Sequence, residues 1–110
     1  MNAKTKIAIV LVTAPNKKVA RKLAQIILQK RMVACVNLVA KIESHYWWKN
    51  KIEKADEVLM ILKTTAVRLP QLQKCVLENH PYDRPEFAVL PLSSGNKKYL
   101  DWIAESVHQH

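Results

Sequence analysis

The segment from Val33 to Thr65 constrains the fold most, because it predicts one very long β-hairpin. Its first arm, Val33–Trp48, contains no glycine or proline and is rich in β-branched and aromatic residues, as strands are. Its second arm is Lys51–Thr64, where alternate residues point to opposite faces, with Val58, Met60 and Leu62 on one and Leu59 and Ile61 on the other. The only polar break is Trp48-Lys49-Asn50-Lys51, and asparagine tolerates the positive φ of a tight turn.

This hairpin is longer than the domain that must carry it. Each arm of roughly fifteen residues would extend about 50 Å at ~3.3 Å per residue. A globular chain of 110 residues is only about 35 Å across. The part beyond the core carries large apolar side chains that are costly to expose to water: Ile42, Tyr46, Trp47, Trp48 and Ile52. We therefore expect an obligate oligomer, with Tyr46, Trp47, Trp48 and Ile52 in its interface.

Periodicity places the remaining elements around the hairpin. The pattern predicts strands over 6–13 and 86–92, and helices over 17–30, 65–79 and 97–107. Asn16 is an expected N-cap, Thr65 is a candidate cap, and prolines at both ends of the last strand place it at a sheet edge. The order β-α-β-β-α-β predicts an α+β, ferredoxin-like fold with an antiparallel sheet, helices on one face and an added C-terminal helix. We expect one domain over 1–110, with 1–5 and 108–110 frayed.

The expected helices also have predicted faces. For the second helix, the core stripe is Leu69, Leu72 and Val76, with Cys75 beside it. For the last helix, the expected apolar stripe is Tyr99, Trp102, Ile103 and Val107. In the first helix, four basic residues crowd the polar side of the initial turns, namely Lys17, Lys18, Arg21 and Lys22. Like charges four residues apart repel, so the simplest interpretation is solvent exposure.

The composition excludes several function classes. The single glycine, Gly95, rules out a glycine-rich phosphate loop, and no hydrolase or zinc-protease motif occurs. Cys35 and Cys75 lie forty residues apart in apolar patterns, which predicts free, buried thiols rather than a metal or disulfide framework. The hairpin carboxylates Glu53, Asp56 and Glu57 are more typical of a solvated surface than of acid–base catalysis. We therefore predict that the protein is not an enzyme.

The apolar segments and the charge bear on location and partners. No apolar run reaches the ~18 residues of a membrane span, and the apolar run after the basic start is too short for a signal peptide. We therefore predict a cytoplasmic protein without a membrane partner. The net charge of +9 would suit an anionic partner, but the lysines are spread over most segments. That charge is the only support for a nucleic-acid-binding module, and the aliphatic central strands lack the aromatics of RNA-recognition domains.

Two histidines are candidate metal ligands. His80 ends the second helix just before Pro81, where a cation also suits the helix dipole, so capping is the alternative interpretation. His45 lies in the hairpin between Ser44 and Tyr46, where a hydrogen-bonded strand residue is the alternative.

Seven motifs together resemble the CutA divalent-cation tolerance proteins. They are Thr13-Ala14-Pro15-Asn16, Ala34-Cys35-Val36-Asn37, Ser44-x-Tyr46-x-Trp48, Ile61-Leu62-Lys63-Thr64, His80-Pro81-Tyr82-x-x-Pro85-Glu86, Leu90-Pro91 and Tyr99-Leu100-x-Trp102-Ile103. They occur in order from about Ile7 to Val107. The resemblance implies a ferredoxin-like protomer in a homotrimer whose hairpins join neighbouring sheets, a link to copper and other divalent ions, and a likeness to the PII signalling proteins.

The chain departs from the family at two of its three copper-linked positions: Val12 stands where bacterial members have a cysteine, and Asn79 replaces the first of two histidines. Separately, Asn50 replaces the common hairpin-turn glycine. Only His80 remains of the three ligands that the resemblance implies. We therefore expect a role in copper or divalent-ion tolerance or response with weak copper binding. A PII-like protein that binds a small anionic ligand between subunits is the alternative.

Overall fold

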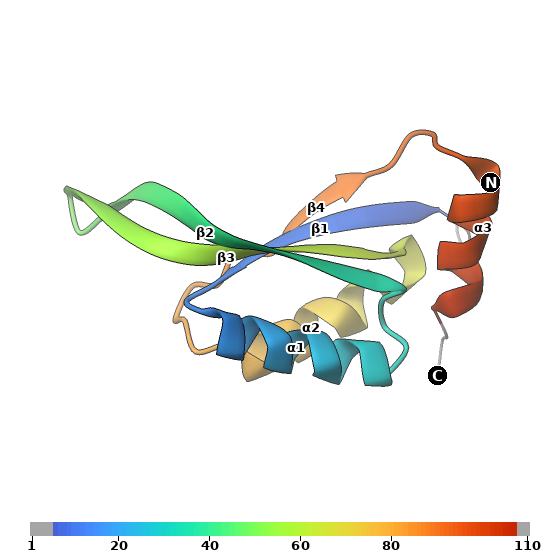
Figure 1. The fold of residues 1–110 in the computed structure, drawn as a ribbon, viewed down its shortest axis with the longest axis horizontal. Helices are drawn as coiled ribbons and strands as arrows, with labels where there is room; N and C mark the ends of the chain where they lie inside the picture. Colours follow the sequence, from blue (N-terminus) through green and yellow to red (C-terminus); the bar gives the residue numbers. More distant parts are fainter. Residues whose placement is uncertain (1–5, 108–110) are drawn as a thin grey trace.

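The computed structural model describes residues 6–107 (Figure 1). The chain forms the elements Ile7–Ala14 (β1), Lys17–Gln29 (α1), Cys35–Trp48 (β2), Lys51–Thr65 (β3), Ala66–Arg68 (the 3₁₀ turn η2), Leu69–Asn79 (α2), Ala88–Pro91 (β4) and Lys97–Ser106 (α3). The expected fraying of 1–5 and 108–110 falls outside the described residues.

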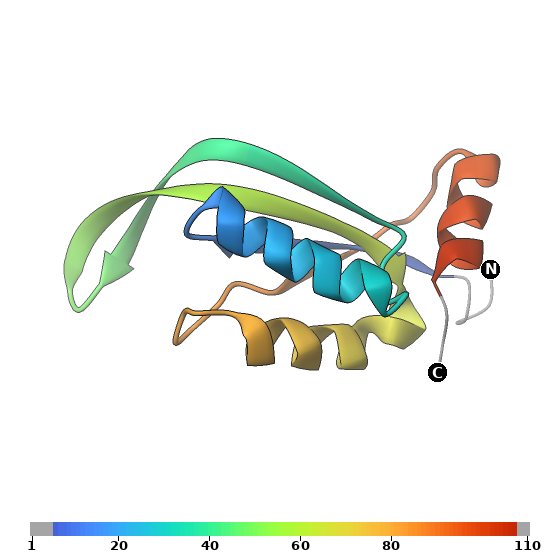
Figure 2. The same ribbon diagram turned by 60° about the horizontal axis from the view of Figure 1, so that its bottom comes forward.

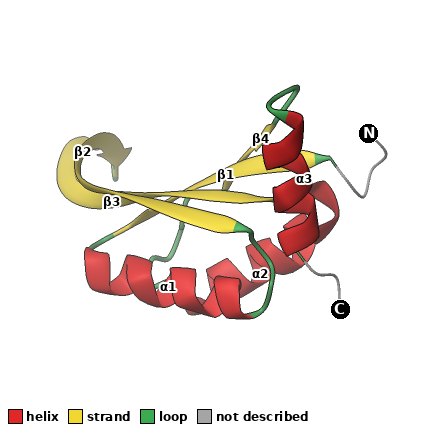
Figure 3. Ribbon diagram, turned by 45° about the vertical axis from the view of Figure 1, so that its right-hand side comes forward, coloured by secondary structure: helices red, strands yellow, loops and turns green. Residues whose placement is uncertain are grey.

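The four strands form one antiparallel sheet in the order β2-β3-β1-β4. Helices α1 and α2 lie side by side on one face of this sheet, and α3 lies at its end (Figures 1 and 3). This arrangement confirms the α+β, ferredoxin-like prediction, including the place of β4 at a sheet edge.

The hairpin β2–β3 extends well beyond the helices and curls at its tip (Figure 2). Its turn consists of Lys49 and Asn50, with φ of 50° and 64°, the left-handed pair that a two-residue hairpin turn requires. Nearer the core, β2 carries a β-bulge, because Val39 pairs with Leu59 whereas Ile42 pairs with Glu57. Lys41 in this bulge also has a positive φ of 60°. The bulge bends the strand and shifts its register by one residue.

The main core lies between the sheet and the two helices. Alternate sheet residues supply one side of it, among them Val10, Val12, Val58, Met60 and Leu62. The helices supply the other side with Ala20, Leu23 and Ile27 from α1 and Leu72, Cys75 and Val76 from α2. The predicted stripe of α2 is therefore confirmed, except that Leu69 is only partly buried.

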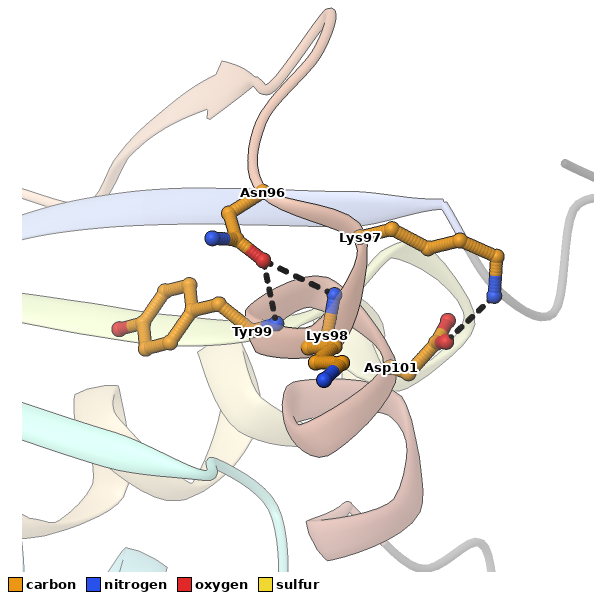
Figure 4. A network of polar contacts seen from close by, with 5 residues as sticks. All are labelled: Asn96, Lys97, Lys98, Tyr99 and Asp101. Carbon is orange, nitrogen blue, oxygen red and sulfur yellow. Dashed lines mark hydrogen bonds and ion pairs between the residues drawn. The ribbon is translucent and has the colours of Figure 1, made fainter.

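The predicted face of α3 is partly wrong. Ile103 is fully buried as expected, but its buried partner is Leu100, and the two pack with Ile7 in a small second cluster. Tyr99 and Trp102 instead lie exposed and stacked on each other, with ring centroids 5.7 Å apart. The helix begins at Asn96, whose side-chain oxygen accepts from the N–H groups of Lys98 and Tyr99 (Figure 4). Because α3 meets only the end of the sheet, it buries a narrow stripe and leaves its aromatic side free.

Several boundaries also differ from the sequence prediction. The Asn16 cap is confirmed, since its side chain accepts from the Val19 N–H at 2.9 Å. Thr65 makes no side-chain cap, and the 3₁₀ turn η2 precedes α2 there. Strand β4 is shorter than the predicted 86–92, because only Ala88–Pro91 pair with β1. Strand β1 runs one residue later than predicted, and α1 and α3 each end one residue earlier.

Candidate functional site

His80 is held by both of its ring nitrogens. Its Nε2 lies 2.8 Å from the carbonyl oxygen of Thr13 at the end of β1. Its Nδ1 accepts from the backbone N–H of Tyr82 at 3.1 Å. These two bonds fix the neutral tautomer with the proton on Nε2. The residue is only 9% exposed, so His80 ties the segment after α2 to β1.

Tyr82 connects the same segment to the hairpin. Its hydroxyl donates to Oε2 of Glu57 on β3 at 2.7 Å, and its ring lies 4.7 Å from that of His80. Burial, followed by the hydrogen bond and charge of Glu57, raises the pKa of Tyr82 well above its ordinary value. Burial and the Glu57 carboxylate likewise raise the pKa of Glu86. The phenol therefore stays protonated as a donor.

Thr13, Glu57, His80, Tyr82 and Glu86 together form what we call the hairpin-base site. Its members come from β1, β3 and the segment between α2 and β4, which lie far apart in the sequence. Two of the motifs that resemble the CutA proteins, those at Thr13 and His80, meet here through the His80–Thr13 bond. The site joins the hairpin to the body of the protein through a neutral imidazole and a phenol–carboxylate bond.

Replacing Glu86 with Gln should raise the free energy of unfolding at pH 7. A carboxyl whose folded-state pKa is raised disfavours folding when ionised, so removing its charge helps above its ordinary pKa of 4.5. Because the side chain is partly exposed, we expect only about 0.2–1 kcal/mol. The gain should disappear as the pH falls below that ordinary value.

Urea unfolding at pH 7 and pH 4, at fixed protein concentration, measures this difference. Asp83→Asn is the matched control, because Asp83 is an exposed carboxylate in the same segment that lies 3.9 Å from Arg84. A loss of stability at pH 7 in the Glu86 variant would mean that its carboxylate has a favourable partner.

The other expected metal donors do not gather around His80. Val12 is buried in the core, and the side-chain nitrogen of Asn79 donates back to the Cys75 carbonyl at 2.8 Å. Cys75 is buried as predicted, whereas Cys35 is only half-buried, so the prediction of a buried thiol there is wrong. Among residues 6–107, no group of three His, Cys, Asp or Glu side chains is placed to hold a metal ion. The described donors therefore do not make up a three- or four-ligand site.

His45 lies on the exposed part of the hairpin. Its Nε2 is 2.9 Å from a carboxylate oxygen of Glu43, which also lies 3.9 Å from Lys54. This pairing matches the alternative interpretation of His45 as a hydrogen-bonded strand residue. Its metal-binding role stays a prediction.

The apolar hairpin tip is uncovered in the protomer. Trp47 and Ile52 pair directly across the strands and are 72% and 67% exposed. Tyr46 and Trp48 point to the other face and are 41% and 43% exposed. Arg84 lies over the Trp48 ring at 6.0 Å. Their exposure agrees with the predicted interface, which itself stays a prediction.

The sequence reasoning missed the partners that define the hairpin-base site. Glu57 was interpreted as a solvated carboxylate, although it pairs with Tyr82. The available signal was the pair of prolines, Pro81 and Pro85, which stiffens the segment that carries Tyr82 and Glu86. The bond from His80 to the main-chain carbonyl of Thr13 could not be predicted, because every residue type carries such a carbonyl.

Comparison with known proteins places the chain among its relatives. The family model described as CutA1 divalent ion tolerance protein matches residues 8–106. This chain belongs to the CutA1 family. A divalent-cation tolerance protein CutA from Thermus thermophilus is 40% identical over 89% of this chain and 95% of its own length. The crystal structure of CutA1 from Oryza sativa superimposes with a TM-score of 0.92 at 42% identity, covering 96% of this chain and 99% of that chain.

The CutA1 relatives differ in length and location. The chain spans 57% of a chloroplastic rice CutA and 52% of the mouse protein CutA, to which it is 44% and 47% identical. A relative from Archaeoglobus fulgidus is described as periplasmic. The cytoplasmic location therefore stays a prediction for this family member. Within residues 6–107, no helix is long and apolar enough to cross a membrane. The family is described by divalent-ion tolerance. That the protein is not an enzyme stays a prediction.

Proposed function

We propose that this CutA1 family member acts as a homotrimer in divalent-ion tolerance or response, with weak binding of copper. The observation that carries the proposal is a second apolar surface, which continues from the sheet into the hairpin. On the sheet face opposite α1 and α2, the register aligns Ile9, Leu11, Leu59, Ile61 and Leu90, all half-buried or exposed. Within the described residues no helix lies over the centre of this face (Figure 1). Further copies of the chain would bury this face together with the hairpin tip, which supports the trimer in this proposal.

The proposed copper site uses His80, and it is necessarily weak. A bound ion would have to replace the Thr13 or the Tyr82 bond of the imidazole, since both nitrogens are occupied. Asn79 and Val12 supply no strong donor beside it, and Cys75 would have to lose its proton in apolar surroundings. Copper binding at His80 would therefore compete with the hydrogen bonds that hold the hairpin-base site.

Titration calorimetry with Cu²⁺ tests this part of the proposal. A variant truncated after Val107 removes His108 and His110, which lie outside the described residues and could chelate metal loosely. We expect an affinity no better than about micromolar for this variant, since a competitive site needs three or four converging donors. The affinity should drop further on His80→Ala.

His45→Ala is the matched control and should leave the affinity unchanged, because His45 contacts Glu43 instead. Nanomolar, stoichiometric binding that survives His80→Ala would place the ligands elsewhere. Native mass spectrometry of the same samples reports the number of subunits, so failure of the copper proposal remains distinct from failure of the trimer.

A small anionic ligand, as in PII-like proteins, is the second candidate function. The observation in its favour is a hollow of about 170 Å³ at the base of the hairpin, lined in part by Lys17, Lys41, Asp56 and Glu57. Ligand sites usually enclose about 300–1,000 Å³, so a nucleotide-sized ligand would need a neighbouring subunit to complete the site. A bound mass after incubation with ATP in the mass spectrometry experiment would support this candidate.

A further inference from the structure

The outward face of α1 is uniformly basic. Its apolar stripe is used in the core, where Ala20, Leu23 and Ile27 are buried. Successive helical residues are 100° apart, so four basic side chains fall within one arc opposite that stripe. We call them the α1 basic face: Lys17, Lys18, Arg21 and Lys22, all exposed. The helix itself contains no acidic residue.

The net positive charge of the molecule is concentrated in its helix layer. Helices α1 and α2 lie side by side in one layer (Figure 2). With Lys30, Arg31 and Lys74, this layer holds seven exposed basic residues against the single exposed carboxylate of Glu78, a surface charge of +6. In the hairpin and the segment before β4, by contrast, six carboxylates are balanced by six basic residues, so these parts are neutral overall.

The α1 basic face makes no ion pair within residues 6–107, although Lys17 lines the hollow that also contains Asp56 and Glu57. Among the described residues, the ion pairs involve His45, Lys54, Arg84 and Lys97, and none involves this face. Lys17 and Arg21, like Lys18 and Lys22, stand four residues apart and repel each other. Cations in the first turn of a helix also oppose its dipole. The attraction of an anionic partner for these four cations would offset both unfavourable interactions.

We propose that the α1 basic face binds the phosphate backbone of double-stranded nucleic acid. Residues four apart are about 6 Å apart along the helix axis. Duplex DNA carries one negative charge per about 1.7 Å of its axis, so its backbone presents phosphates to both basic rows at once. The face contains no aromatic side chain on which unpaired bases would stack, which favours a duplex over a single strand.

A membrane is the less suitable anionic surface. Helices that lie on lipid bilayers insert an apolar face, and the apolar face of α1 is already buried against the sheet. The proposed binding depends on the phosphate charges of the nucleic acid and not on its base sequence. It uses none of the residues of the proposed copper site, because His80 bonds to Thr13 and Tyr82 and to no residue of the α1 basic face.

Fluorescence anisotropy with a labelled duplex DNA of about 20 base pairs tests the proposal on the full chain. With four phosphate contacts, affinity should fall about 100-fold between about 50 and 200 mM salt. Changing all four residues of the α1 basic face to Gln should abolish most binding and lower the salt slope by roughly 3–4. Circular dichroism should show an intact or slightly stabilised helix, since the repulsion is removed.

The matched control removes four positive charges elsewhere, with Lys49, Lys51, Lys97 and Lys98 changed to Gln. It should keep the affinity within a few-fold of the unmodified chain and should keep its salt slope. Equal losses in both variants would show a net-charge effect and overturn the proposal. Tighter binding to vesicles of anionic phospholipid than to the duplex would also overturn it, in favour of a membrane surface.

Discussion

Trp48→Ala is expected to dissociate the proposed trimer, at a cost of about 3–5 kcal/mol if the partner subunits bury the ring fully. In the protomer the indole is 43% exposed, and the cations of Lys49 and Arg84 lie over its ring. The ring therefore keeps exposed apolar surface that the proposed assembly would bury. Sedimentation equilibrium should give about three times the protomer mass of 12.7 kDa for the unmodified chain and a lower mass for the variant.

Leu28→Ala provides the control for this experiment. Leu28 is also a large apolar residue with an exposed surface, but it lies on α1, away from the hairpin. Its truncation should leave the mass unchanged and should cost less stability than Trp48→Ala, because only part of its surface is buried. A monomer of the unmodified chain whose mass is independent of concentration at micromolar protein would contradict the trimer itself.

Ile103→Ala should produce the second large effect, a loss of about 2–5 kcal/mol in the free energy of unfolding. Ile103 is fully buried and is the centre of the small cluster with Ile7 and Leu100 that attaches α3 to the sheet. The helix has few other anchors, among them the bond from Arg31 to the Ser106 carbonyl at 3.4 Å. Hydrogen exchange should therefore report faster opening of α3 than of α1 in this variant.

Glu105→Ala is the control within the same helix, because its side chain is exposed and should matter by less than about 0.5 kcal/mol. Unchanged stability of the Ile103 variant would mean that α3 is held by other contacts, such as its exposed aromatic side in the assembly.

The sheet and its order could be predicted because each rests on local patterns. Val58, Met60 and Leu62 alternate with Leu59 and Ile61, and all of the first set are buried. The two-residue turn at Lys49 and Asn50 then makes β2 and β3 neighbours in the sheet. The buried sides of α1 and α2 are equally predictable from the sequence, because only one side of each helix is apolar.

In helix α3 the apolar pattern of the sequence does not determine which residues are buried. Tyr99 and Leu100 are adjacent, and either can begin an apolar stripe that continues through Ile103 to Val107. The choice depends on the shape of the sheet end that α3 meets, which is a tertiary property. The hairpin-base site is hidden for a related reason, because His80 bonds to the main chain of Thr13, and any residue there would offer the same carbonyl.

The bulge in β2 reconciles two registers that would otherwise conflict. At the core, the apolar alternation fixes Val39 opposite Leu59, and at the tip the two-residue turn fixes Trp48 opposite Lys51. Between these two fixed regions β2 has one residue more than β3, and this extra residue forms the bulge. A one-residue deletion at Ala40 or Lys41 would therefore preserve both registers and straighten the strand. The same deletion between Ile42 and Trp48 would exchange the faces of the residues on one side of it, so insertions and deletions in this arm are tolerable at a single place.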